Sequence, residues 1–402
     1  MNKRVISEMN SYIYKNNSFS INETLNRLGF DGSYRPNGHD VTFLLRQDQI
    51  EKTSIQKKER LIQSGKVHYS QMISAEKSPS AEHLKHFNQA MKLGAERMAN
   101  DIQKLGNALI KRFDGQEIVL VSLIRAGVPL GVLLKHHIST TQPCFHYGIS
   151  IIRDRGIDHA ALNAIINEHG SKNIVFVDGW TGKGAISKEL TLTLQNHPAL
   201  FDEGHDLPRL VALADLGGCA WLSASYDDWL IPSGILGSIV SGLTSRSILL
   251  DDVDEAHSKN HCYDLDLWHK CIIYDELKAH DISVYFVDTI YGIMQNNPTD
   301  AVAEISEQDR MAQNHLCKTT IDWIGEEYAI NNVNLIKPSI AEATRAVLRR
   351  VPERILISDD QDENVQLLLH FAKEHNVPVD VLGSKIWPYK AVTLIKKVSG
   401  KE

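Results

Sequence analysis

Short apolar runs alternate with helix-compatible segments through the middle of the chain. The runs lie at 118–122, 173–177 and 209–214, and each ends in a turn rich in Gly, Ser or Asp. Strands that are apolar on both faces and separated by helices are typical of a parallel sheet covered on both sides. The pattern predicts an α/β domain, whose ligands should bind beyond the carboxyl ends of the strands.

The flanking regions follow other patterns. The N-terminal part is polar, with a predicted strand at 41–45, a helix that starts near Ser78-Pro79 and a second helix at 98–110. Near the other end, Ser339 and Glu342 form a capping box before a helix, and two strand patterns with a helix between them follow. We therefore predict three parts, a mostly helical region packed on the core (1–112), the α/β domain (113–318) and a small C-terminal α/β/α unit (319–402).

Composition narrows the class of protein. The 402 residues include 43 Lys and Arg against 50 Asp and Glu, and a net charge of −7 argues against general polyanion binding. No apolar run approaches the roughly 18 residues that span a bilayer, and the N-terminus lacks the apolar core of a signal peptide. Five cysteines without CxxC spacing argue against a disulfide scaffold or zinc ribbon. These features predict a cytoplasmic enzyme with reduced thiols and no membrane partner.

The turn after the first central strand has the composition of an anion site. It reads SLIRAGVPLG (122–131), in which small residues let backbone N–H groups approach an oxyanion at the start of a helix. Arg125 would add a bidentate anion ligand. The alternative is a tight strand-to-helix turn with a surface arginine.

The turn after the second central strand is more specific. It reads DGWTGKGAIS (178–187), and its glycines, Thr181 and Lys183 would form a phosphate cradle between strand and helix. Asp178 at the strand end could hold a ribose hydroxyl or a hydrated magnesium ion. The Walker pattern GxxxxGK[ST] is not matched, and the alternative is a Gly-rich turn with a packed Trp.

These two turns resemble loops of phosphoribosyltransferases. SLIRAGVPLG is similar to the pyrophosphate loop of the uracil type, and NIVFVDGWTGKGAI (173–186) resembles the phosphoribosyl pyrophosphate loop of type I enzymes. The resemblance implies a type I phosphoribosyltransferase-like fold, a phosphoribosyl pyrophosphate or ribose-phosphate ligand, magnesium held indirectly by Asp178, and glycosyl transfer in nucleotide or RNA-linked stress metabolism. Unlike that family's pair of acids, Asp178 stands alone, because Gly179 follows it.

The resemblance also implies roles for single residues. Asp178 and Arg125 would be catalytic. The ligand-binding residues would be Gly127, Gly179, Thr181, Gly182, Lys183, Gly184, Arg153 and Arg246. The last two come from a segment that would close on pyrophosphate (146–156) and from a Ser/Gly/Thr-rich segment (233–247), which are otherwise a solvated loop and a buried turn.

The longer pattern has a second resemblance. With HYS (68–70), IPSG (231–234) and SGLTSR (241–246), the central motif looks like a bacterial family of tellurium-resistance-type gene clusters, over about residues 30–310. Its members are described as phosphoribosyltransferase-like and also as StiP cysteine proteases. This leaves a cysteine peptidase as the alternative function.

A peptidase would need a thiolate beside a base. Cys271 lies two residues after His269, and Cys219 follows two glycines. Either cysteine could instead be a small buried apolar residue. His68 would be the base or only a helix-entry residue.

The C-terminal unit resembles the Pelota/L7Ae-type RNA-binding domain. The similar segments are LIKPS (335–339), ILISDDQD (355–362) and HNVPVDVLGSK (375–385). The resemblance implies structured RNA as a partner and RNA contacts by Lys337, Ser339, Thr344, Arg345 and Lys385. The alternatives are a lid or a dimerisation domain in a homodimer. A third hypothesis for the whole chain is a non-catalytic nucleotide sensor with an RNA-binding tail.

Overall fold

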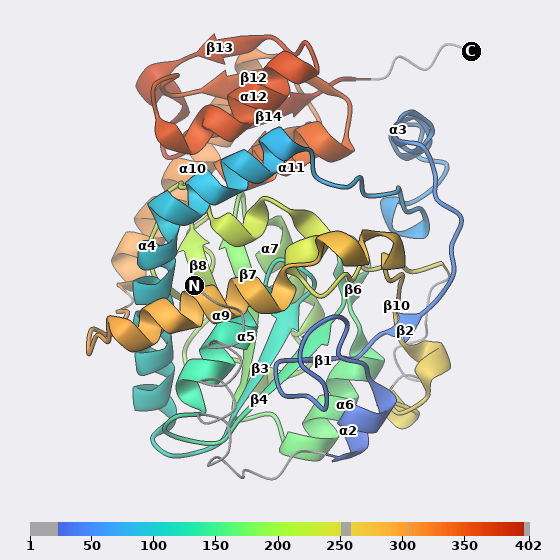
Figure 1. Ribbon diagram of the computed structural model, residues 1–402, viewed down its shortest axis with the longest axis vertical. Coiled ribbons are helices and arrows are strands. Elements are labelled where there is room, and N and C mark those ends of the chain that lie inside the picture. Colours follow the sequence, from blue (N-terminus) through green and yellow to red (C-terminus); the bar gives the residue numbers. More distant parts are fainter. Residues whose placement is uncertain (1–22, 251–258, 305, 398–402) are drawn as a thin grey trace.

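A six-stranded parallel sheet forms the centre of the molecule. The computed structural model describes residues 23–250, 259–304 and 306–397 (Figure 1). The strand order is β1-β4-β3-β7-β8-β9, and all neighbours are parallel. The strands are β1 (Thr42–Phe43), β4 (Cys144–Ile149), β3 (Ile118–Leu123), β7 (Ile174–Thr181), β8 (Leu210–Asp215) and β9 (Leu222–Ser223). The predicted parallel α/β sheet is confirmed, and the three predicted central strands are β3, β7 and β8.

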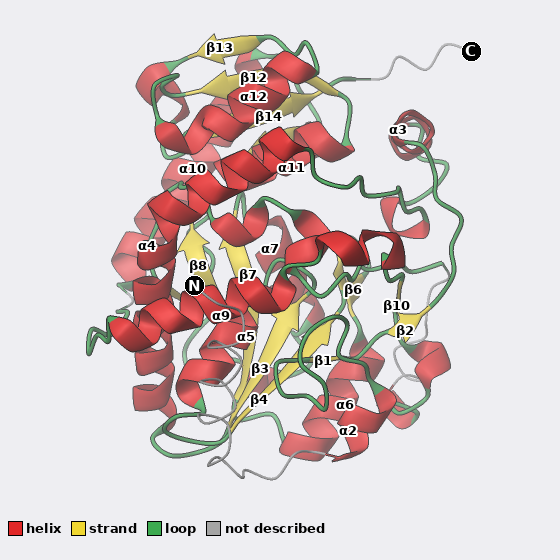
Figure 2. Ribbon diagram, in the orientation of Figure 1, coloured by secondary structure: helices red, strands yellow, loops and turns green. Residues whose placement is uncertain are grey.

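Helices cover both faces of this sheet (Figure 2). One face carries α4 (Ala81–Phe113), α5 (Val128–Ile138) and α9 (Ser283–Asn296), and the other carries α2 (Glu23–Leu28), α6 (His159–His169) and α7 (Ala185–Thr193). In β3, Leu120 belongs to the first apolar core, whereas Val119 and Val121 belong to the second. This two-sided burial explains why the central strands read as continuous apolar runs.

A single helix of 33 residues replaces the two that were predicted between Ser78 and Ile110. The helix α4 starts after Ser80, whose side chain accepts a hydrogen bond from the N–H of His83, and it continues to Phe113. Gly94 lies in its middle, where a Cβ atom would stand 3.0 Å from the Trp229 ring. The glycine therefore marks a close approach between two elements and does not end the helix.

The C-terminal unit has a second sheet with the order β11-β14-β12-β13. Its elements are β11 (Ile336–Pro338), α11 (Ile340–Arg349), β12 (Pro352–Ile357), α12 (Gln366–Glu374), β13 (Val379–Val381) and β14 (Ala391–Ile395), preceded by α10 (Glu307–Glu327). The predicted helix after Ser339 is confirmed, because the Ser339 side chain accepts from the N–H of Glu342. The remaining elements are α3 (Ile55–Gln63), the pair β2 (Arg46–Gln47) and β10 (Lys270–Cys271), and the pair β5 (Ile151–Ile152) and β6 (Gly156–Ile157).

The C-terminal unit sits over the carboxyl ends of the central strands (Figure 1). Asp228 fastens it there, because its carboxyl group accepts hydrogen bonds from the N–H groups of Ile340 and Lys390 at 3.0 and 2.9 Å. Burial raises the pKa of Asp228 to about 7. The start of α11 is thus capped by a residue of the other unit.

The predictions of no membrane partner and of a mostly helical N-terminal region also bear on the fold. Among the described helices, none is long and apolar enough to span a membrane. The first 22 residues of the predicted N-terminal region lie outside the described residues, and residues 42–43 of that region form a strand of the central sheet.

Candidate active site

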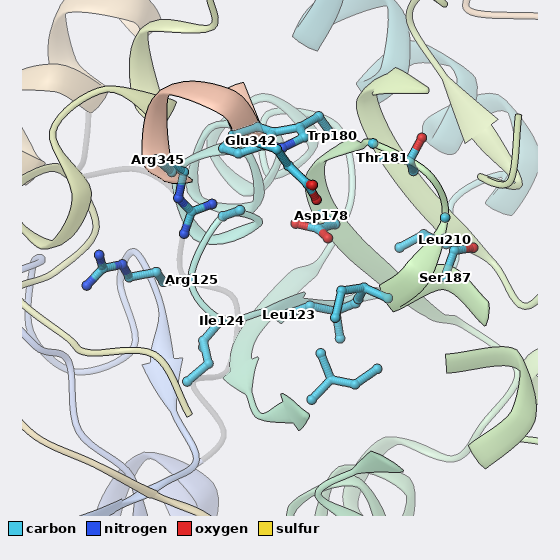
Figure 3. A pocket seen from close by; sticks show the side chains of 15 residues that line it. Leu123, Ile124, Arg125, Asp178, Trp180, Thr181, Ser187, Leu210, Glu342 and Arg345 are labelled. Atoms are coloured by element: carbon cyan, nitrogen blue, oxygen red, sulfur yellow. The ribbon is translucent and has the colours of Figure 1, made fainter. Parts of the chain in front are cut away.

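A cavity of about 180 Å³ lies where the central strand ends meet α11 (Figure 3). Three segments contribute most of its wall: the turn after β3, the end of β7 with the turn that follows, and one face of α11. The lining residues are Leu123, Ile124, Arg125, Ala126, Ile151, Asp178, Trp180, Thr181, Gly182, Gly184, Ile186, Ser187, Leu210, Glu342 and Arg345. Both turns that the sequence singled out therefore meet at one site, and the C-terminal unit closes it.

Asp178 projects into this cavity from β7. Its Oδ1 accepts a hydrogen bond from the N–H of Gly179 at 2.7 Å. Burial raises the pKa of Asp178 to about 7, although the Gly179 N–H and the Arg345 charge oppose that rise. The carboxyl group therefore keeps its proton to a higher pH than an ordinary aspartic acid does.

The two glycines beside Asp178 serve close packing. A Cβ atom on Gly127 would lie 2.1 Å from the carbonyl oxygen of Val177, and one on Gly179 would lie 2.8 Å from that of Ala126. The turn after β3 can thus approach β7 only because both positions lack a side chain.

Arg125 is already paired within the protein. Its guanidinium forms an ion pair with Glu76 and donates to the carbonyl of Thr244 at 2.9 Å. Glu76 also accepts from Arg349 of α11 and from the N–H of Ser238, both at 3.0 Å. Burial would raise the pKa of Glu76, but Arg125 and Arg349 outweigh it and hold that pKa well below its usual range.

Arg345 also lines the cavity, but unlike Arg125 it has no carboxylate partner among the described residues. Its guanidinium lies 5.4 Å from the centre of the Trp180 ring, and no hydrogen bond or ion pair joins it to any described residue. Figure 3 shows its side chain on the same side of the cavity as Arg125. Burial lowers its pKa to about 9.

The polar side chains of the turn after β7 form hydrogen bonds with other groups of the protein. The Thr181 hydroxyl donates to Asp215 and accepts from the N–H of Gly217 at 2.9 Å. The Lys183 ammonium donates to the carbonyls of Val333 and Ile336, both at 2.6 Å. Burial, with a smaller contribution from Lys337, lowers the pKa of Lys183 to about 7. This turn therefore joins the two units.

Gly182 and Gly184 belong to the same turn, between β7 and α7. The Gly182 carbonyl accepts from the Tyr389 hydroxyl at 3.1 Å. Gly184 precedes α7 with a φ of 76°, a left-handed conformation that favours glycine. The first N–H groups of α7 have no acceptor within their own helix, and Gly184, Ile186 and Ser187 at this helix start line the cavity.

Arg153 and Arg246 do not line the cavity. Both guanidinium groups lie against the Tyr69 ring, 5.2 and 5.3 Å from its centre. Arg153 donates to Asn334 at 3.0 Å, and Arg246 donates to the carbonyl of Tyr69 at 2.6 Å. They form a cation–aromatic contact that connects loops.

The five cysteines, all within the described residues, differ in accessibility. Cys219 is half-buried, and the others are buried: Cys144, Cys262, Cys271 and Cys317. Cys271 is 0% exposed, and burial raises its pKa to about 12. Its neighbour His269 turns away and bonds Ser150 through Nδ1 at 2.6 Å. Cys271 therefore lacks both the access and the base that a nucleophile needs.

Cys219 follows β8 in a tight turn. Its N–H donates to Asp215 Oδ1 at 3.0 Å, and its Sγ lies 3.8 Å from the same oxygen. A Cβ atom on Gly184 or Gly217 would come within 3.0 Å of this sulfur. The thiol thus sits beside the turn that forms the cavity wall. No histidine ring hydrogen-bonds a cysteine thiol among the described residues, and His68 caps a short 3-10 helix.

Comparison with known proteins identifies the family. Residues 32–291, more than half of the chain, match the family described as "Tellurite-like stress resistance cysteine protease StiP". A protein of Acinetobacter baylyi (strain ATCC 33305 / BD413 / ADP1), "Cysteine protease StiP", is 51% identical over 380 residues, which cover 94% of this chain and 97% of that protein. The chain belongs to the StiP family. Residues 315–397 also match the family "PELOTA RNA binding domain".

The StiP match corrects the leading prediction of function. Phosphoribosyltransferase activity, with phosphoribosyl pyrophosphate as substrate, is wrong, because both the family and the relative are named as cysteine proteases. The predicted alternative, a cysteine peptidase, is the better supported one. The physical reason for the error is that Arg125, Thr181 and Lys183 already bond to protein groups, which occupy the donors that a phosphate would need.

The predicted RNA-contacting residues of the Pelota-type unit face mostly inward. Ser339 and Thr344 are buried, and the Thr344 hydroxyl donates to the carbonyl of Ile340 at 2.7 Å. Lys337 is half-buried near Lys183, and Arg345 lines the cavity. Lys385 alone of these five is exposed.

Sequence reasoning missed three residues of the site. Asp215 was detectable, because it is the acid that ends the apolar run of β8, just before the glycines at 217 and 218. Glu76 and Tyr389 have no local signal, since their partners lie 49 and 207 residues away in the sequence.

We expect Asp178→Asn to raise stability by about 1–3 kcal/mol near pH 8 and by clearly less near pH 5. The pKa of Asp178 in the folded protein, about 7, exceeds its ordinary 3.8, so folding favours the protonated form. That contribution is complete below the ordinary pKa and is lost as pH rises through about 7. Asn keeps the neutral state at every pH.

Urea unfolding midpoints measured across this pH range test the expectation. Asp322→Asn is the control, because Asp322 is exposed on α10. A stability change by Asp178→Asn that is the same at both ends of the range would contradict it.

Proposed function

We propose that this chain is a cysteine peptidase with Cys219 as its nucleophile. The observation that carries the proposal is the 51% identity, over 94% of the chain, to a protein named cysteine protease. Among the five cysteines Cys219 alone is not buried. It also follows β8 at the carboxyl edge of a parallel sheet, where such folds bind their ligands.

The chemistry can be followed from the groups around Cys219. Burial and the neighbouring Asp215 raise the pKa of the Cys219 thiol, so its resting form is protonated. Burial also raises the pKa of Asp215, which makes this carboxylate a stronger base than usual. Asp215 would take the thiol proton as Sγ attacks the peptide carbonyl.

The rest of the reaction follows from this attack. The oxyanion would form next to the free N–H groups that begin α7, whose partial positive charge stabilises it. The carbon–nitrogen bond would then break, and the proton on Asp215 would pass to the leaving amine. Water would hydrolyse the resulting thioester and regenerate the thiol of Cys219.

The test is alkylation of the full chain with iodoacetamide, followed in time beside hydrolysis of an unfolded protein substrate. We expect activity to disappear in step with modification of Cys219, mapped by mass spectrometry. Loss of activity in step with a different cysteine would refute Cys219 as the nucleophile. Absence of hydrolysis by the untreated protein would refute the peptidase proposal.

We propose RNA binding as a second function, because residues 315–397 match an RNA-binding family. Since Lys385 is the outward-facing member of the predicted contacts, it would meet RNA phosphates first. We expect Lys385→Ala to weaken binding of a structured RNA and to reduce the slope of log affinity against log salt by about 1.

Fluorescence anisotropy of a labelled RNA hairpin at several salt concentrations measures both quantities. Lys66→Ala serves as the control, because Lys66 is an exposed lysine of the StiP-family region. Equal effects of the two substitutions, or binding that salt does not weaken, would count against this surface.

Other predictions remain predictions. They are the narrower assignment to the type I phosphoribosyltransferase fold, a cytoplasmic location, a homodimer and magnesium as cofactor. The residues fit magnesium poorly, because Asp178 has a raised pKa and lies beside Arg345. No step of the proposed reaction uses this ion.

A further inference from the structure

Two helices from different units bring potential metal ligands together. Glu82 and His86 are four residues apart on α4, and His370 and Glu374 are four residues apart on α12. This spacing places each pair on one face of its helix. The two helices pack against each other, with α12 above the N-terminal part of α4 (Figure 1).

The donor atoms are close but not bonded to one another. Those of Glu82, His86 and His370 all lie within 4.8 Å of each other. The Nε2 of His86 is 3.7 Å from Glu82 Oε1, and that of His370 is 3.9 Å from Glu374. Both distances exceed a hydrogen bond. Ligands of a tetrahedral zinc ion, bound at about 2.0–2.2 Å, lie roughly 3.3–3.6 Å apart.

The aromatic packing brings the two imidazoles together as well. The ring centres of His86 and His370 are 4.9 Å apart, at an interplanar angle of 38°. All three donors are half-buried, so an ion can reach them from solvent. Lys85 donates to Glu82 at 2.9 Å and would have to release it.

A second cluster of possible metal ligands, His39, Asp40 and His136, differs from this one in its hydrogen bonds. There both imidazoles already hydrogen-bond Asp40, at 3.0 and 2.8 Å. Arg35 adds an ion pair to the same carboxylate. In that cluster one ring nitrogen of each histidine already binds the carboxylate, whereas His86 and Glu82 of α4 stay 3.7 Å apart.

We propose that Glu82, His86 and His370, with Glu374 in reach as a fourth ligand, form a zinc site that joins the StiP-family region to the Pelota-type unit. Two imidazoles with carboxylates suit zinc and related transition metals, whereas calcium and magnesium prefer oxygen ligands. Because the ligands come from both units, the ion binds only when α12 is docked on α4. Zinc would therefore stabilise the closed arrangement that covers the cavity.

The test uses the metal-free full chain and zinc in competition with a chromogenic chelator. We expect one zinc ion per chain, with affinity at least about 100-fold lower in His86→Ala and in His370→Ala, since even loss of an outer-shell partner costs 10–100-fold. His315→Ala, at an exposed position of α10, should bind as the wild type does. His39→Ala should also keep the affinity.

Melting curves provide the second readout. Zinc should raise the melting temperature of the wild type and of His315→Ala but not that of His86→Ala, while the metal-free proteins should melt alike. Unchanged zinc affinity in His370→Ala, or loss of zinc in His39→Ala, would overturn the proposal. So would failure of the wild type to compete with the chelator.

Discussion

Replacing Cys219 by alanine is expected to lower peptide hydrolysis at least about 1,000-fold, the scale on which loss of a covalent nucleophile acts. Cys219 is the half-buried cysteine, and its sulfur lies beside Asp215 and the start of α7. Removing it leaves the cavity intact but removes the atom that would form the thioester. Initial rates on an unfolded protein substrate, compared with the wild type, measure the effect.

Cys271→Ala is the matched control for this experiment. Cys271 is fully buried in β10, so its loss should cost some stability and leave most of the activity. Circular dichroism and melting curves of both variants separate loss of chemistry from loss of fold. Retention of activity in Cys219→Ala together with its loss in Cys271→Ala would assign the nucleophile to the buried cysteine instead.

Replacing Glu76 by alanine is expected to destabilise the protein by about 3–5 kcal/mol, the usual cost of leaving a buried charge without its partner. The change would orphan Arg125, whose side chain is 3% exposed, and would remove an acceptor from Arg349. Since Arg349 belongs to α11, the loss should loosen the C-terminal unit as well. Urea unfolding, followed by tryptophan fluorescence, measures the change.

Lys52 and Glu276 provide a matched comparison. They form an ion pair at the surface, where the Glu276 side chain is 46% exposed. Glu276→Ala should cost less than about 1 kcal/mol, because water screens this pair. An equal cost for the two substitutions would show that Glu76 acts as an ordinary surface acid.

The pH dependence of the Glu76 effect has a definite sign. The pKa of Glu76 in the folded protein lies below its ordinary 4.5. Its contribution is therefore fully present above that value and is lost as pH falls toward the folded pKa. The difference between wild type and Glu76→Gln should shrink in acid, and a constant difference would mean that the charge plays no part.

Local sequence patterns predicted the helices and strands better than they predicted the contacts between them. The apolar runs at β3, β7 and β8 and the capped start of α11 were readable, because burial on both faces and capping depend on residues near in sequence. Between Ser78 and Ile110 the pattern was read as two helices, although Gly94 merely accommodates Trp229. A glycine's role in packing depends on what lies opposite it.

The candidate site shows the same division. The turns at 122–131 and 178–187, predicted to bind phosphate groups, both line the cavity, because strand ends of a parallel sheet gather at one edge. Phosphate binding by these turns stays a prediction, and the partners of Arg125 and Lys183 were not readable, since they come from distant segments. A motif shows which donors are present but not which acceptors have already taken them.

Local patterns along the chain were enough to identify the α/β class, the order of the main elements, the two turns at the strand ends and the resemblance to both families. The folded structure was needed to show that Cys219 is the half-buried cysteine, that Glu76 neutralises Arg125, and that α11 places Arg345 at the cavity. The reason is physical. Element formation follows local periodicity and capping, whereas exposure, charge pairing and pKa depend on neighbours that the chain brings together only by folding.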